Sequence, residues 1–261
     1  MVSTGALTGI VIELVLSVGF PVGLIIYFSR KHWISWKAVG IGAFVFIFFS
    51  QVLEKILHIQ MLASDGSAAL KWSASPLLFV LYAGLSAGIF EEVGRYIGFR
   101  WLLKNRESYG DGLSLGVGHG GVEALLIGGL AALNALVIAN QINQGTLADT
   151  LGSSLSAAQI ESIKDQFTHV GFWSYALAGI ERVVAVTFHM LASLIVLLAV
   201  RKKAIQYLIY AILLHAVFDF VPAMYQAKII TSLWIVESII VILGILSVFG
   251  IMKMKKVYTG E

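Results

Sequence analysis

The chain alternates between long runs of apolar residues and short polar stretches that contain most of its charges. Seven of the runs are long enough to cross a bilayer as helices, since a crossing takes about 20 apolar residues. Their expected bounds are about 6–28, 33–57, 76–103, 113–139, 172–200, 204–224 and 229–252. Because a helix satisfies its own backbone hydrogen bonds in lipid, this pattern predicts an all-α, polytopic bundle of transmembrane helices.

Composition agrees with a membrane protein. Hydrophobic residues make up 58% of the 261 residues and charged residues 13%, against about a quarter charged in soluble domains. We therefore expect one integral membrane domain over residues 1–261, with a motif-bearing core from about 76 to 224. The absence of cysteine excludes disulfides, thiolate metal ligands and a cysteine nucleophile. The net charge of +3 is explained by loop topology, so we expect no nucleic-acid partner.

Basic residues predict how the bundle is oriented. Twelve of them follow the first, third, fifth and seventh spans, and only four lie at the opposite side. Loops on the cytoplasmic side of a membrane carry an excess of Lys and Arg. The N-terminus is therefore predicted to lie outside the cell and the C-terminus in the cytoplasm. The expected location is the cell membrane, as a multi-pass protein of a bacterial plasma membrane.

Ionisable residues nevertheless occur inside the predicted spans, among them several in each of the third, fourth, fifth and sixth. A charge within the bilayer costs a few kcal/mol or more, so such residues indicate a functional site. At about 1.5 Å of rise per residue, at least one of them from each of these four spans lies within about one helical turn of the same depth. The sequence therefore predicts one cavity among the third to sixth spans, lined by Glu91, Glu92, Glu123, His189, His215 and Asp219.

These residue types suit hydrolysis by an activated water molecule. Glu91 and Glu92 are adjacent carboxylates that resist simultaneous ionisation in a low-dielectric cleft, which provides a base and an acid in one site. Histidines can orient water, donate to an oxyanion or bind Zn²⁺. Because His119-x-x-x-Glu123 differs from the zincin spacing His-Glu-x-x-His, we expect no cofactor and favour a metal-free site over a zinc site.

Four short motifs, in order along the chain, resemble those of the CAAX-protease and bacteriocin-processing (CPBP) superfamily. They are Glu91-Glu92-x-x-Arg95, His119-x-x-x-Glu123, Phe188-His189 and His215-x-x-x-Asp219. More narrowly they are similar to the YhfC branch of glutamic-type intramembrane endopeptidases, over about half of the chain.

The resemblance implies hydrolysis of a peptide bond in a membrane-embedded or lipid-modified protein or peptide, with the lipid bilayer as its surroundings. It also implies that Glu91 activates water, that Glu92 assists it, and that His189 and His215 steady the water and the oxyanion. Arg95, His119, Glu123, Arg182 and Asp219 would support these catalytic residues.

Three positions depart from the pattern of the prenyl proteases in this superfamily. Arg95 follows the glutamate pair one residue earlier than in their Glu-Glu-x-x-x-Arg motif. Glu123 stands where their second motif ends in His, and Asp219 stands where Asn is common. We therefore do not infer that the substrate carries a prenyl group.

Other functions stay open on the sequence alone. A proton-coupled transporter or metal permease also needs intramembrane Glu, His and Asp, and an inactive scaffold could keep the same fold. Arg95 could merely neutralise Glu92 as a structural ion pair. Arg182 could do the same for Glu181, and His58, near the end of the second span, is expected to be solvated. Convergence of the motifs on one cavity would favour an enzyme, whereas a continuous polar route across the bilayer would favour transport.

Overall fold

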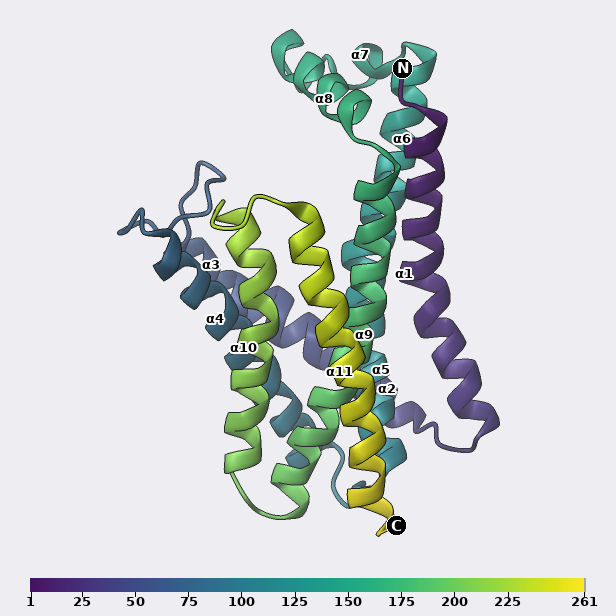
Figure 1. Cartoon of the computed structure of the whole chain (residues 1–261), viewed down its shortest axis with the longest axis vertical. Helices are drawn as coiled ribbons and strands as arrows, with labels where there is room; N and C mark the ends of the chain where they lie inside the picture. Colours follow the sequence, from purple (N-terminus) through teal and green to yellow (C-terminus); the bar gives the residue numbers. More distant parts are fainter. Residues whose placement is uncertain (261) are drawn as a thin grey trace. The chain divides into compact units, whose positions relative to one another are not determined.

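The computed structural model describes residues 1–260 and folds them into helices, with no β-strand among those residues. Hydrogen bonds within each helix satisfy the backbone, as lipid requires. The helices, shown in Figure 1, are α1 Thr4–Arg30, α2 Trp36–Val45, η1 Phe46–Glu54, α3 Lys55–Met61, α4 Pro76–Ile97, η2 Gly98–Leu102, α5 Tyr109–Glu123, η3 Ala124–Gly129, α6 Leu130–Gln144, α7 Leu147–Leu151, α8 Ala157–His169, α9 Phe172–Arg201, α10 Gln206–Gln226 and α11 Leu233–Thr259.

Seven helical stretches within residues 1–260 are long and apolar enough to cross a membrane: Thr4–Arg30, Trp36–Met61, Pro76–Leu102, Tyr109–Gln144, Phe172–Arg201, Gln206–Gln226 and Leu233–Thr259. Each overlaps one of the spans expected from the sequence, which confirms the all-α, multi-pass fold. The fourth runs for 36 residues because η3 joins α5 to α6 without a break. The outer position of the N-terminus stays a prediction.

Three of the crossings contain a π-helical segment, in which the backbone turns more widely than in an α-helix. Such segments are rare and are frequently found at functional sites. Here η1 ends at Glu54 and η3 begins directly after Glu123. Both carboxylates are buried. Two of the three irregular segments therefore adjoin a buried acidic residue.

The described chain divides into two compact units. Unit 1 comprises Met1–Val22 and Glu123–Val183, and thus the first part of α1, η3, α6, α7, α8 and the first part of α9. Small side chains let its helices approach closely, as is common in membranes: a Cβ added at Gly179 would lie 2.8 Å from the Cα of Glu13. Its buried apolar core is Val2, Ala6, Ile10, Ala132, Ala135 and Ala139. Whether the chain forms a single domain stays a prediction.

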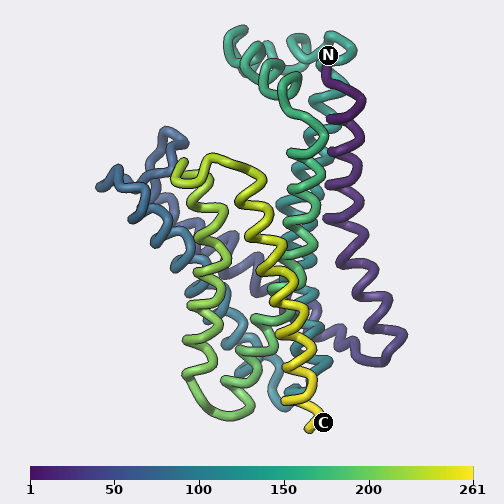
Figure 2. The backbone as a smooth tube through the Cα atoms, viewed as in Figure 1, coloured from purple at the N-terminus to yellow at the C-terminus, as the bar shows by residue number. Residues whose placement is uncertain are grey.

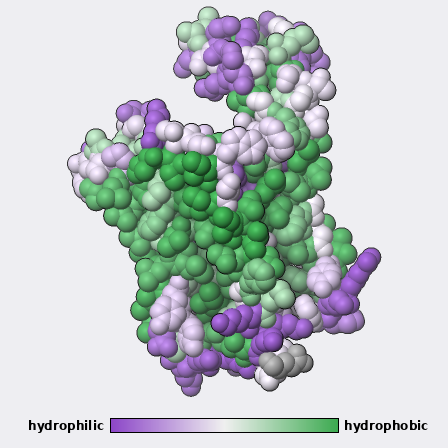
Figure 3. Space-filling model, in the orientation of Figure 1, coloured by the Kyte–Doolittle hydropathy of each residue, from purple (hydrophilic) through white to green (hydrophobic). Residues whose placement is uncertain are grey.

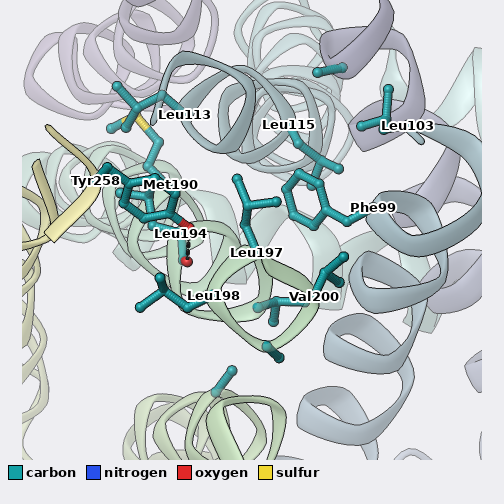
Figure 4. Close-up of a cluster of buried hydrophobic side chains, with 14 of the residues drawn as sticks. Phe99, Leu103, Leu113, Leu115, Met190, Leu194, Leu197, Leu198, Val200 and Tyr258 are labelled. Atoms are coloured by element: carbon teal, nitrogen blue, oxygen red, sulfur yellow. Dashed lines mark hydrogen bonds between the residues drawn. The ribbon is translucent and has the colours of Figure 1, made fainter. Parts of the chain in front are cut away.

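Unit 2 comprises Gly23–Val122 and Val184–Glu261, described to residue 260. Its largest apolar cluster lies near those helix ends that carry the excess of Lys and Arg. We call this side of unit 2 the basic end. Tyr258 belongs to this cluster, and its hydroxyl donates a hydrogen bond to the Leu194 carbonyl at 2.8 Å. We call the residues labelled in Figure 4 the basal cluster: Phe99, Leu103, Leu113, Leu115, Met190, Leu194, Leu197, Leu198, Val200 and Tyr258.

Within unit 2, α4 packs on α10 at short range because glycines face the partner helix. A Cβ at Gly88 would lie 2.7 Å from the carbonyl oxygen of Ile212. The chain then turns at the end of α10 and returns along α11, so these two helices are antiparallel (Figure 2). Their outward surface is apolar (Figure 3), as expected for helices in lipid, with these side chains exposed: Ile209, Leu213, Val217, Ile242, Ile245 and Phe249.

The packing of α2 on α5 depends on Gly42 and provides a test of the fold. A Cβ at Gly42 would overlap the carbonyl oxygen of Leu115, whereas a Cβ at Gly40 would meet nothing within 4 Å. Gly42→Ala is therefore expected to destabilise the protein by about 1–3 kcal/mol, because backbone atoms cannot move aside freely. Gly40→Ala, two residues earlier on the same helix, should not destabilise it, since Ala favours a helix over Gly. Equal thermal unfolding midpoints in detergent would contradict this packing.

Candidate active site

Helix α4 carries the two central carboxylates. It starts after Ser75, whose hydroxyl accepts a hydrogen bond from the Leu78 N–H at 3.4 Å, and Pro76 occupies its first turn. Both features favour a helix start. Glu91 and Glu92 lie four turns further on and are 5% and 0% exposed. As neighbours on a helix they point about 100° apart, so each meets different partners.

One oxygen of Glu91 is the meeting point of four other side chains in unit 2. Glu91 Oε2 accepts a hydrogen bond from Arg95 Nη2 at 3.2 Å and lies 2.8 Å from His119 Nε2. His215 Nε2 lies 3.7 Å from the same oxygen, and His189 Nδ1 lies 4.0 Å away. These groups come from α4, α5, α9 and α10, and two of them, His189 and His215, are residues that the sequence had placed at the depth of Glu91.

Glu92 holds His215 in a defined orientation. Its Oε1 accepts a hydrogen bond from Arg95 Nη1 and lies 2.6 Å from His215 Nδ1. An ionised carboxylate can only accept, so Nδ1 of His215 carries the proton in this contact. The other ring nitrogen then faces Asp219, with Nε2 to Oδ2 at 3.4 Å. Glu92 and Arg95 therefore position a histidine whose Nε2 is directed toward the space beside Glu91.

Arg95 links both carboxylates to the third histidine. Its side chain is fully buried, and the ion pair with Glu91 that the i,i+4 spacing predicts is present. Arg95 Nη2 also lies 2.7 Å from His189 Nδ1. Because a guanidinium has no acceptor, Nδ1 of His189 must be unprotonated and accept this hydrogen bond. The rings of His189 and His119 lie 4.9 Å apart between centroids.

Two residues of the predicted site, Glu123 and Arg182, belong to unit 1. Arg182 Nη1 donates to Glu123 Oε1 at 3.0 Å, and Nη2 pairs with Glu181. The structural ion pair between Arg182 and Glu181 that the sequence allowed is therefore present. Within unit 1 the guanidinium thus faces two carboxylates.

Sequence reasoning missed a further buried carboxylate in unit 2, that of Glu54. It is 4% exposed, and its Oε1 accepts a hydrogen bond from Ser86 Oγ at 3.0 Å. His58 Nε2 lies 3.4 Å from the same oxygen, and His58 Nδ1 lies 2.8 Å from the hydroxyl of Tyr82. His58 is therefore not simply solvated, as its place near the end of the second span had suggested. The overlooked signal was the i,i+4 spacing of Glu54 and His58 inside an apolar run.

Three of the converging side chains offer atoms that a metal ion prefers. Glu91, His119 and His189 each present one potential ligand atom, and these atoms lie within 4.8 Å of one another. Carboxylate oxygen and imidazole nitrogen are usual ligands of Zn²⁺, and three protein ligands leave a fourth position for water. The donor set therefore fits a divalent metal, provided that Arg95 Nη2 withdraws from His189 Nδ1. This geometry favours a metal more than the motif spacing did.

Comparison with known proteins finds relatives along almost the whole chain. Residues 16–240 match the family described as YhfC intramembrane metalloprotease. A Bacillus subtilis (strain 168) protein, described as uncharacterized membrane protein YhfC, is 37% identical over 258 residues, which cover 99% of this chain and 100% of that protein. No solved structure matches the chain. The similarity extends well beyond the four motifs.

Proposed function

Since this chain belongs to the family of YhfC intramembrane metalloproteases, we propose that it is a membrane peptidase that hydrolyses a peptide bond of a membrane-embedded or lipid-modified protein. The family description supports peptidase activity in general. The convergence of Glu91, His119 and His189 beside His215 in unit 2 is the observation that supports the chemistry proposed below.

Glu91, His119 and His189 are proposed to hold one divalent metal ion, with Zn²⁺ as the first candidate. When bound, such an ion polarises the substrate carbonyl and makes a coordinated water molecule more acidic. The metal-free site favoured by the motif spacing becomes the alternative that the test below distinguishes.

His215 is proposed to transfer protons during hydrolysis. Glu92 holds Nδ1 of this ring, and Nε2, when it does not donate to Asp219, would accept a proton from water beside Glu91 and return it to the leaving amine. Asp219 lies 3.4 Å from Nε2 and would stabilise the protonated imidazole. His215 thereby takes the role that the resemblance had assigned to Glu91, because a carboxylate that binds a metal is a poor base.

Metal content tests this proposal. Protein purified without added metal is expected to contain about one zinc ion per chain, as a single site with three protein ligands would hold. His119→Ala and His189→Ala should both lose it, whereas His58→Ala, a half-buried histidine of unit 2 outside the donor set, should keep it. Full activity in a wild-type protein that contains no stoichiometric metal would contradict the metal site and restore Glu91 as the base.

Hydrolysis agrees with unit 2 better than transport does. Four of the motif side chains approach one oxygen of Glu91, and the apolar basal cluster follows along the same helices toward the basic end. A transporter needs polar groups along a route from one side of the membrane to the other. Within unit 2, the described residues form no such route through the basal cluster.

A further inference from the structure

Because the proposed function is hydrolysis, one water molecule must reach the active site for every bond that is cleaved. The site is deeply buried: Glu92, Arg95 and His119 have 0% exposure. It also lies within helices that cross the membrane, where hydrocarbon holds no water for reaction. Water must therefore follow polar groups inward from one end of unit 2.

Toward the basic end of unit 2, the helices that carry the site present mainly apolar side chains. Beyond Arg95, α4 continues with Phe99 and Leu103, which are 2% and 1% exposed. On α9, Leu194 and Leu197 follow His189 and are both fully buried. These side chains pack together in the basal cluster (Figure 4). A tightly packed apolar layer of this kind leaves no polar partners for a chain of water molecules.

The opposite direction is lined by polar side chains along one stripe of the second crossing. The buried residues of η1 are Phe46, Ser50 and Glu54, at intervals of four, and His58 follows at the same interval in α3. At the inner end, the ring of Phe46 contacts that of His119, with centroids 5.3 Å apart. The stripe therefore begins against a residue of the active site and leads away from the basic end.

Helix α4 completes this stripe from the facing side. Ser86 donates to Glu54 at 3.0 Å, and the hydroxyl of Tyr82 lies 2.8 Å from His58. We call Ser50, Glu54 and His58, with Tyr82 and Ser86, the polar track.

The outer end of the polar track opens into a pocket. His58 lines this open cavity of ≈ 320 Å³ together with Lys55 and Lys71, at the end of α3. A pocket with two ammonium groups and an imidazole at its wall is hydrated, because charged groups retain water. The hydrogen-bonding contacts of His58 thus connect this hydrated pocket with the buried carboxylate of Glu54.

We propose that the polar track is the route by which water enters the active site, from the pocket at the end of α3 and not from the basic end. Successive groups on the stripe are four residues apart, which is at most about 6 Å along the helix axis, a gap that single water molecules can bridge. Glu54 is the positioning residue at the centre of the route. Both of its contacts use Oε1, so Oε2 is left to bind water.

The lack of cysteine in the chain provides a direct test, since any introduced thiol is unique. Thiols react with charged methanethiosulfonate reagents as thiolates, which form where water reaches them. In full-length protein in detergent, Ser50→Cys is expected to react at least about tenfold faster than Ser193→Cys. Ser193 is the matched control, because it lies on α9 one turn beyond His189 toward the basic end and is fully buried. Ser86→Cys provides a second reporter on the facing helix.

Glu54 variants then test the route itself. In the Ser50→Cys protein, Glu54→Leu should slow labelling by at least about tenfold because it removes the central polar partner, whereas Glu54→Gln should not. Two results would overturn the proposed route. One is that Ser50→Cys and Ser86→Cys are labelled no faster than Ser193→Cys, and the other is that Glu54→Leu does not change the labelling rate of Ser50→Cys. Labelling does not require peptide cleavage, so the water route can be confirmed even if the protein proves to have no peptidase activity. An active peptidase with unreactive thiols would instead refute the route alone.

Discussion

Glu91→Gln is expected to lower the rate of peptide-bond cleavage by about 10³-fold or more while the protein stays folded. Glutamine keeps the shape of the side chain but has no negative charge with which to hold a metal ion or accept a proton. Arg95 retains Glu92 as a charged partner in this variant, so the interior keeps one of its ion pairs. Cleavage of a transmembrane peptide by the purified protein, with metal content measured alongside, checks the expectation.

A second buried carboxylate provides the control for this experiment. Glu237 lies in α11 of unit 2, is 5% exposed and belongs to no motif. Glu237→Gln should therefore retain most of the activity. Loss of both metal and activity in Glu91→Gln would support Glu91 as a ligand, whereas loss of activity with full metal content would identify it as the base. Cleavage at the wild-type rate would refute the peptidase site and favour transport.

Arg95→Leu is expected to destabilise the protein by about 3–5 kcal/mol, because removing one partner of a buried ion pair leaves an uncompensated charge. In this variant Glu91 and Glu92 would both remain in the interior without the guanidinium that contacts them. Thermal unfolding with and without Zn²⁺ measures the effect. Zinc should stabilise Arg95→Leu more than wild type, since the metal would replace the lost charge and Nη2 would no longer compete for His189 Nδ1.

An exposed arginine one and a half turns further along serves as the comparison. Arg100 lies in η2 with its side chain at the surface, and Arg100→Leu should change stability by no more than about 0.5 kcal/mol. Arg95→Lys should fall between the two, because an ammonium keeps the charge but cannot reproduce the forked contacts of Arg95. If Arg95→Leu were as stable as Arg100→Leu, the stabilising role of the buried ion pairs of Arg95 would be refuted.

Most of the fold could be predicted from the sequence because crossing a bilayer is a local requirement. Each span needs enough apolar residues and helical hydrogen bonds within itself, so hydropathy alone located all seven stretches. The long fourth crossing was underestimated by several residues at its end. The residues after Ala139 are polar, so hydropathy gave no sign that α6 continues. A helix tolerates polar residues where it leaves the hydrocarbon.

Depth within the membrane could also be predicted, since rise per residue is constant along a helix. Counting from the basic end brought Glu123, His189 and His215 to the level of Glu91, and within unit 2 the structure places His189 and His215 4.0 and 3.7 Å from Glu91 Oε2. The same count could not tell which carboxylate would be central. That depends on the rotation of each helix about its axis, which hydropathy leaves undetermined.

Only the tertiary structure decided which atoms meet. It placed Oε2 of Glu91 among three histidines and directed Glu92 toward His215 and Arg95. It also assembled metal-binding donors from three different helices, which a motif within one helix cannot reveal.

Glu54 is a second example of what the sequence determines and what only the tertiary structure decides. The sequence determined that this carboxylate and His58 share a helix face, because i,i+4 spacing is local. Its burial and its contacts with Ser86 and, through His58, with Tyr82 come from the packing of a second helix. The sequence by itself therefore determined which stretches are long and apolar enough to cross a membrane and how far along each helix its polar groups lie. Side-chain partners were decided by packing between helices, because those contacts join positions that no local period relates.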